Sequence, residues 1–224
     1  MKTRVQLLEH LMLFVTAHKQ QLFQKVLANR TRHVTVVLEN IFQPQNASAV
    51  IRSCDVFGFQ DLHVIENSNK YNLNPKVVLG SSKWITLYKY NKKKDNTLDC
   101  ITHLKQKGYK IYATTPHTDD HLISDIPLDD KCAFLFGTEL TGLSETALQH
   151  ADGFVKIPMY GFTESLNISV SAAVSLYEIS KRLKSADINW QLSEEEKVEQ
   201  LIRWSKKVIK NSDLIEKEFL AQNV

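Results

Sequence analysis

The sequence predicts an α/β protein in which a parallel β-sheet carries helices on both faces. Its 224 residues, 43% of them apolar, are enough for one domain of ordinary size with short terminal additions. Five short runs rich in β-branched and aromatic residues are almost continuously apolar, as in strands that are covered on both faces. The segments between several of these runs have helical periodicity, which is typical of crossover connections. The expected strands are 34–39, 61–66, 110–115, 132–137 and 154–159.

The segments that flank this sheet are expected to be helical. Val5, Leu8, Leu11, Met12 and Val15 recur at helical spacing near the N-terminus. A segment over 193–210 opens with acidic and ends with basic residues, which suits the helix dipole. We therefore divide the chain into an N-terminal basic helical extension (1–33), a central α/β domain (34–183) and a C-terminal helical extension (184–224).

Four helices are expected inside the central domain. The first covers 46–59, with Asn46 as the cap at its start and Gly58 in the left-handed conformation past its end. Small residues in the last of the four let another backbone approach closely. The other three helices are expected over 97–108, over 144–151 with Ser144 as its cap, and over 167–183.

Composition excludes several classes of protein. The longest apolar stretches are a few residues long, far short of the roughly 20 that span a bilayer, and no cleavable export signal is visible. The three cysteines are odd in number and are never spaced as Cys-x-x-Cys, so neither a disulfide framework nor a zinc site is indicated. We expect a cytoplasmic protein.

Basic residues gather at the two ends of the chain, although the net charge is only +3. Residues 1–33 hold six basic side chains and one acid, and four more bases near the other end share one face of an expected helix. Such patches favour a phosphate backbone, while the alternative is a solvated helix face. The candidate contacts to a nucleic acid are Arg30, Arg32, Arg203, Lys206, Lys207 and Lys210.

Two glycine-containing loops follow strands directly. Gly137 and Gly142 bracket the first loop, and Gly161 lies in the second. Because ligands of an open parallel sheet bind at the carboxyl ends of its strands, the two loops are expected to form one pocket, unless both are ordinary turns. No dinucleotide or Walker sequence is present. The polar residues expected to converge at this edge are Asn46, Glu139, Ser165 and Asn167.

The sequence holds three further candidate sites. Arg52 follows Asn46 by one and a half helical turns and either serves this edge or extends to water. The segment 117-HTDDH-121 offers His117, Asp119, Asp120 and His121 without a further motif to complete a metal site, so no metal is expected. Cys54 lies on an apolar helix face and is expected in the core rather than as a nucleophile.

Three segments together resemble the three ordered motifs of the SpoU-type 2'-O-ribose RNA methyltransferases, members of the SPOUT superfamily. They are 46-NASAVIRSCDVFGF-59, 134-FLFGTELTGLS-144 and 157-IPMYGFTESLNISVSAAVSLYE-178. The helical ends and the entry 35-TVVLENIFQPQNASA-49 are most similar to the branch called TrmH, which modifies guanosine 18 in the D-loop of tRNA. The resemblance implies a deep C-terminal trefoil knot that holds S-adenosylmethionine, a homodimer, and tRNA as the partner.

The resemblance also implies roles for individual residues. Asn46 and Arg52 match the Asn and catalytic Arg of the first motif, Glu139 matches the acid of the second, and Ser165 and Asn167 match the polar pair of the third. Arg52 is assigned to clamp a phosphate and stabilise an alkoxide, and to act as a general base only in dry surroundings. The implied cofactor-binding residues are Thr114, Gly137, Ile157, Met159 and Leu166.

One departure and two alternatives remain open. Thr138 stands where many relatives have Asn, which affects a local hydrogen bond. The main alternative is ribose methylation of ribosomal RNA or of another tRNA position. The other is a non-catalytic RNA-binding factor on the same scaffold.

Overall fold

The structure is a computed structural model that describes residues 2–116 and 120–222. The chain forms two compact units. The larger unit contains Thr31–Trp190, and the smaller one combines the chain up to Arg30 with the chain from Gln191 onward. The two ends of the sequence therefore build one unit together.

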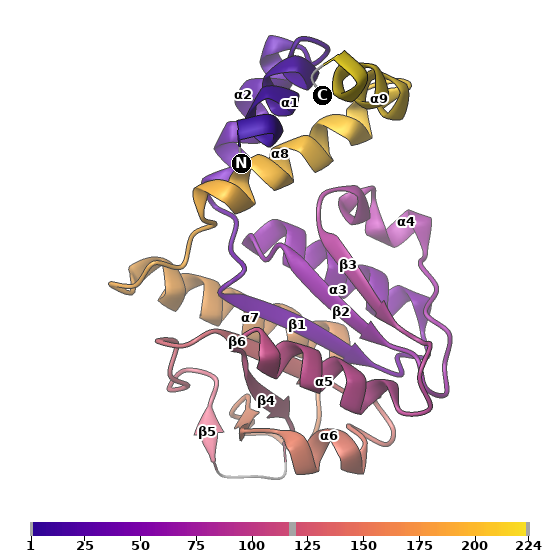
Figure 1. Ribbon diagram of the computed structural model, residues 1–224. Helices are drawn as coiled ribbons and strands as arrows, with labels where there is room; N and C mark the ends of the chain where they lie inside the picture. Colours follow the sequence, from indigo (N-terminus) through magenta and orange to yellow (C-terminus); the bar gives the residue numbers. More distant parts are fainter. Residues whose placement is uncertain (1, 117–119, 223–224) are drawn as a thin grey trace. The chain divides into compact units, whose positions relative to one another are not determined.

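A parallel sheet forms the centre of the larger unit, as predicted. Its strand order is β3-β2-β1-β6-β4-β7-β5, and every pairing between neighbours is parallel. All carboxyl ends therefore meet at one edge of the sheet, and Figure 1 shows the arrowheads of β1, β2 and β3 ending on the same side. The strands are β1 (Val34–Glu39), β2 (Asp61–Ile65), β3 (Thr86–Tyr90), β4 (Lys110–Thr114), β5 (His121–Leu122), β6 (Cys132–Phe136) and β7 (Gly153–Lys156).

The five predicted strands are confirmed, and two strands were missed. Both missed strands, β3 and β5, lie at the edges of the sheet. In β3, Lys89 is exposed while Thr86 and Tyr90 are buried, so the run is not continuously apolar. The strand β5 has only two residues, too few for a pattern.

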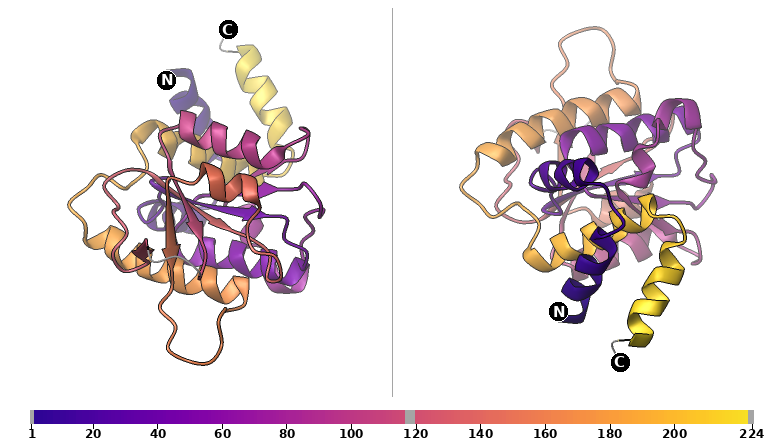
Figure 2. Two further views of the ribbon diagram at one scale, coloured as in Figure 1. Left: turned by 90° about the horizontal axis from the view of Figure 1, so that it is seen from below. Right: turned by 90° about the horizontal axis from the view of Figure 1, so that it is seen from above.

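Helices cover both faces of the sheet, and Figure 2 shows the two layers on either side of the strands. In β1, Val36 and Leu38 belong to the core that includes α3 and α7, while Val37 belongs to the core that includes α5 and α6. This alternation places one pair of helices on each face. The elements are α3 (Pro44–Phe57), α4 (Pro75–Val78), a 3-10 turn (Ser81–Lys83), α5 (Asn96–Gln106), α6 (Glu145–His150) and α7 (Ile168–Ser185).

Two of the three expected helix ends in this unit are confirmed. Gly58 ends α3 with φ 89°, and the Ser144 hydroxyl caps α6 by accepting a hydrogen bond from the Ala147 N–H. The prediction that Asn46 caps α3 is wrong, because the helix begins two residues earlier at Pro44. Proline suits the first helical position, since its fixed φ is already helical and its missing N–H needs no partner. The Asn46 side chain is therefore available for other contacts.

The smaller unit consists of four helices in the described part of the chain. The sequence predicts a single N-terminal helix, but the structure has two. The first helix ends at Met12, and the second begins at Ala17 with Thr16 as its N-cap. Trp204 is 1% exposed and packs beside Phe23 at 5.5 Å between ring centroids. Among the described helices, none combines the length and apolar character that crossing a bilayer requires. The four are α1 (Lys2–Met12), α2 (Ala17–Leu27), α8 (Glu194–Val208) and α9 (Ser212–Gln222).

Candidate active site

Three polar side chains from distant parts of the sequence are in direct contact at the carboxyl edge of the sheet. Asn46 Nδ2, from the first turn of α3, donates to Glu139 Oε1 at 2.8 Å. Asn167 Nδ2, at the start of α7, donates to the same carboxylate oxygen and also to Asn46 Oδ1 at 3.3 Å. The structure thus brings together three of the four residues expected to converge.

The amide of Asn167 is held in place by its own helix. Asn167 is the N-cap of α7, and its Oδ1 accepts hydrogen bonds from Ser169 N at 2.9 Å and from Ser169 Oγ at 2.6 Å. An N-cap side chain satisfies a backbone N–H that has no partner within the helix. Because the oxygen is fixed by the helix start, the Nδ2 group is directed toward Glu139.

A narrow turn carries Glu139. The backbone of Thr138 exchanges two hydrogen bonds with Gly142, each 3.0 Å long, and the Thr138 hydroxyl lies 2.7 Å from that of Thr141. A β-carbon on Gly137 would come within 2.2 Å of the Gly142 carbonyl carbon, so the close turn requires glycine. Gly161, in the second glycine-containing loop, differs: a β-carbon there would meet only the Thr163 backbone nitrogen at 4.0 Å, so that loop does not require glycine.

A cavity of about 430 Å³ lies at the loops that follow β4, β6 and β7. Glu139 and Ser165 line it, and so do apolar side chains such as Leu143 and Val155. This volume is within the range of pockets that hold small organic molecules. All five residues that the resemblance assigns to the cofactor also line it: Thr114, Gly137, Ile157, Met159 and Leu166.

A buried carboxylate anchors the far end of the Glu139 loop. Glu39, the last residue of β1, is 1% exposed, and it accepts hydrogen bonds from Ser144 N and Ser144 Oγ, both at 2.7 Å. It also accepts a hydrogen bond from the Thr97 hydroxyl at the start of α5. Glu39 was not among the residues predicted from the sequence, although a charged residue at the end of an apolar run is a visible signal.

Two of the expected catalytic residues are not part of this cluster. Arg52 is exposed on α3 and is not among the residues that line the cavity. Ser165 lines the cavity and is exposed. The structure thus places Ser165 at the pocket and Arg52 outside it, and the roles of both stay predictions.

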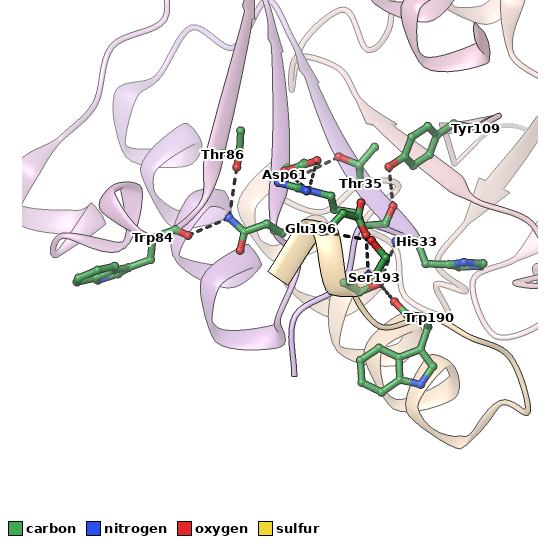
Figure 3. A network of polar contacts seen from close by, with 12 residues as sticks. His33, Thr35, Asp61, Trp84, Thr86, Tyr109, Trp190, Ser193 and Glu196 are labelled. Atoms are coloured by element: carbon green, nitrogen blue, oxygen red, sulfur yellow. Dashed lines mark hydrogen bonds and ion pairs between the residues drawn. The ribbon is translucent and has the colours of Figure 1, made fainter. Parts of the chain in front are cut away.

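The two arginines predicted to contact RNA near the start of the domain have partners inside the protein. Arg30 is 1% exposed, with its guanidinium carbon 5.6 Å from the Trp204 ring centroid. Arg32 Nε donates to the Asp61 carboxylate at 3.3 Å, and Figure 3 shows Asp61 within a larger network of polar contacts. Burial raises the pKa of Asp61, and the Arg32 charge opposes this rise. These positions contradict the expectation that both guanidinium groups lie open to phosphate.

The expected four-residue basic face near the C-terminus is also wrong. Helix α8 ends at Val208, and Ile209 is extended, so Lys210 does not continue the face. Lys206 Nζ forms ion pairs with Glu216 Oε2 at 2.6 Å and with Asp213 Oδ1 at 3.0 Å, and these carboxylates raise the pKa of Lys206. Of the predicted basic face, Arg203 and Lys207 lie on α8 with Lys206, whose charge is balanced by the carboxylates of α9.

The next feature is the expected absence of a metal site around 117-HTDDH-121. Within residues 2–116 and 120–222, no three metal-ligating side chains gather at one point. His117 and Asp119 lie outside the described residues. Asp120 accepts a hydrogen bond from Phe154 N at 2.8 Å, which ties the carboxylate to the first residues of β7.

Comparisons with known proteins find relatives that cover most of the chain. The family model described as SpoU rRNA Methylase family matches residues 33–177. A tRNA (guanosine(18)-2'-O)-methyltransferase of Borreliella burgdorferi is 46% identical over 203 residues, which is 91% of this chain and 91% of that protein. The solved TrmH/SpoU tRNA modifying enzyme of Aquifex aeolicus has a TM-score of 0.76 at 29% identity and covers 86% of this chain and 98% of its own.

A second solved structure is also similar to this chain. The SpoU methyltransferase AviRb of Streptomyces viridochromogenes, determined in complex with AdoMet, has a TM-score of 0.61 at 25% identity. The alignment covers 72% of this chain and 62% of that one.

Proposed function

The chain belongs to the SpoU rRNA Methylase family, and from this premise we propose that it transfers a methyl group from S-adenosylmethionine to the ribose 2'-hydroxyl of guanosine 18 in tRNA. The relative from Borreliella burgdorferi, whose name states this reaction, is similar over nearly the whole of both chains. The observation that carries the proposal is the cluster of Asn46, Glu139 and Asn167 at the rim of the cavity.

The cavity suits S-adenosylmethionine. The apolar side chains of Ile157, Met159 and Leu166 offer surfaces to a flat adenine ring, and the backbone of the Gly137 turn offers polar groups. When bound, the cofactor supplies an electrophilic methyl group on a positively charged sulfur. The residues of the chain then have to hold the ribose in line with that methyl group and exclude water.

The polar cluster serves this positioning. Asn46 and Asn167 direct their amide groups at Glu139, so the carboxylate is fixed in orientation before RNA arrives. Preorganised donors and acceptors avoid rearrangement during the reaction. Ser165, which lines the same cavity, contributes a further hydroxyl to the ribose.

Arg52 is proposed to act on the nucleotide from the exposed side of α3. A guanidinium is not readily deprotonated, but it binds phosphate oxygens and stabilises a developing alkoxide. Its exposure leaves the side chain open to incoming RNA. The proposed general-base role would require dry surroundings that the bound RNA itself provides.

We further propose, from the family to which the chain belongs, that the protein acts in the cytoplasm and that its C-terminal segment forms the family's trefoil knot.

We also propose that the protein acts as a homodimer. Three apolar side chains of α7, at i, i+4 and i+7, share one face of the helix: Val170, Val174 and Tyr177 are 46, 41 and 57% exposed. A second copy of the chain would remove this apolar stripe from water. Light scattering on the purified protein tests the dimer directly.

The experiment that tests the proposed function uses labelled S-adenosylmethionine with total tRNA and, in parallel, with ribosomal RNA. Label in tRNA, released as 2'-O-methylguanosine, supports the proposal. Label confined to ribosomal RNA would support the family's other activity and overturn it.

A further inference from the structure

Asparagine side chains join three loops at the carboxyl edge of the sheet, beside the proposed active site. The loops follow β1 (40–43), β2 (66–74) and β3 (91–95), and we call them the β1–β3 loop platform. Asn40 adopts φ 54°, and its Oδ1 accepts from Asn67 N at 2.8 Å and from Ser68 N at 2.9 Å. Asn69 Nδ2 donates back to Asn40 O at 2.8 Å. The first two loops are therefore fixed to each other.

Asn96 fixes the third loop in the same way. It is 4% exposed at the start of α5, and its N–H donates to Asn67 Oδ1 at 3.0 Å. Its Nδ2 donates to Glu66 O at 3.1 Å, and its Oδ1 accepts from Lys93 N at 2.9 Å. Because these hydrogen bonds join the three loops to one another and to the start of α5, the platform is ordered before any partner binds.

The platform also connects to the active site through hydrogen bonds. Asn67 Nδ2 donates to the Thr97 hydroxyl at 2.8 Å, and this hydroxyl donates to Glu39, the anchor of the Glu139 loop. In the first loop, Gln43 Oε1 accepts from Asn46 Nδ2 at 3.3 Å. A molecule that lies on the platform is therefore adjacent to the polar cluster.

The first loop of the platform, 40–43, presents one aromatic ring to water. Phe42 is 75% exposed, although the residue before it, Ile41, is 6% exposed, and Pro44 begins the helix two residues later. An exposed ring of this kind, next to polar catalytic groups, is a surface on which a nucleobase can stack.

The third loop presents consecutive lysines. Lys92, Lys93 and Lys94 are all exposed, and Lys93 Nζ lies 3.9 Å from Asp99 Oδ1, a long contact for an ion pair. The second and third loops of the platform, 66–74 and 91–95, together contain four lysines and two acids, so their charge is positive overall. Three adjacent ammonium groups beside an aromatic ring match a polymer that alternates phosphates with flat bases.

We propose that the β1–β3 loop platform is an RNA-binding surface, in which Lys92, Lys93 and Lys94 hold backbone phosphates and Phe42 stacks on a base next to the target nucleotide. This inference rests on the proposed function. It adds a contact region inside the larger unit to the basic terminal segments that the sequence indicated. Phosphate contacts position the RNA, whereas the stacked base orients the nucleotide beside it.

The lysines are tested by charge removal with a matched control. In the variant Lys92→Gln, Lys93→Gln, Lys94→Gln, tRNA affinity at about 0.15 M salt should fall roughly 10- to 100-fold. The slope of log affinity against log salt should decrease by about 2 to 2.7, since each lost phosphate contact contributes about 0.7 to 0.9. S-adenosylmethionine affinity should not change. Unchanged tRNA affinity and slope would overturn the proposal.

The control removes the same charge at the opposite edge of the sheet. Lys83, Lys110 and Lys131 are exposed and lie just before or at the first residues of β3, β4 and β6. Their triple change to Gln should leave tRNA affinity within about threefold of the wild type. Equal losses in the two triple variants would mean that overall charge, and not the platform, governs binding, and would also overturn the proposal.

The ring is tested by Phe42→Ala and Phe42→Trp. Loss of one stacked base in Phe42→Ala should weaken tRNA binding roughly 5- to 100-fold, whereas Phe42→Trp keeps an aromatic ring and should bind tRNA as the wild type does. If Phe42 is instead covered by a second copy of the chain, Phe42→Ala will change the oligomeric state in light scattering and leave affinity per site unaltered. That outcome would overturn the stacking contact.

Binding and methylation are measured separately, so the two proposals can fail independently. If the wild type binds tRNA through the platform but methylates a nucleotide other than guanosine 18, the proposed function fails and the platform stands. If the wild type methylates guanosine 18 and the lysine variant does so with unchanged affinity, the platform fails alone.

Discussion

The turn that carries Glu139 gives the sharpest structural prediction, the effect of Gly137→Ala. The added β-carbon would lie 2.2 Å from the Gly142 carbonyl carbon and 2.3 Å from Leu143 N. Carbon atoms in ordinary contact are about 3.5 Å apart, so the two sides of the turn must separate by about 1.3 Å. A displacement of about 1 Å at a catalytic group costs on the order of 100-fold in rate. We expect kcat/KM to fall at least about 100-fold.

Gly161→Ala is the matched control, because Gly161 lies on the second glycine-containing loop and a β-carbon there has open space. Its methylation rate should remain within about twofold of the wild type. Cofactor affinity is measured by calorimetry, methyl transfer with labelled S-adenosylmethionine, and folding by thermal melting. Overpacking should lower the free energy of unfolding by about 1 to 3 kcal/mol without preventing folding. Normal kcat/KM and cofactor affinity in folded Gly137→Ala protein would refute the argument that the closed turn shapes the site.

Three further predictions concern Arg52, Glu39 and Lys206. Arg52→Ala should abolish methyl transfer while cofactor affinity and unfolding free energy stay near wild type, because the side chain is exposed; near-normal turnover would remove its catalytic assignment. Glu39→Gln should lower the free energy of unfolding in urea by about 2 to 3 kcal/mol, because an amide cannot accept both Ser144 hydrogen bonds as the carboxylate does; an unchanged urea midpoint would contradict this. The Glu216 carboxylate raises the pKa of Lys206, so this pair should stabilise the fold below about pH 10.4 and lose its effect as pH rises further. Lys206→Gln should remove that part of the alkaline destabilisation, and an identical pH profile in the variant would show that the pair contributes nothing.

The sequence was most informative about the buried strands. Runs such as 34-VTVVLE-39 are covered on both faces, so their apolar character is continuous and visible. The edge strand β3 has exposed positions, and its residues 86-TLYKY-90 do not form such a run. Burial on both faces, rather than β-propensity alone, decided which strands were predictable.

The candidate site was predictable where residue identity and strand ends coincide. Asn46, Glu139 and Asn167 all begin or follow elements at one edge, and parallel strands bring that edge together. The pairing of Lys206 with Glu216 was not predictable, because it depends on how α9 packs against α8. The burial of Arg30 beside Trp204 likewise depends on a contact between residues 174 positions apart. Charge patterns along a sequence do not show which charges the fold itself will neutralise.

The most direct test of the proposed activity compares two tRNA molecules that differ by one oxygen atom. One carries guanosine at position 18 and the other carries 2'-deoxyguanosine there, and both are incubated with the protein and labelled S-adenosylmethionine. The proposed reaction predicts one methyl group in the first tRNA, mapped by nuclease digestion and mass spectrometry to the ribose of guanosine 18, and none in the second. Equal labelling of the two tRNAs would contradict it.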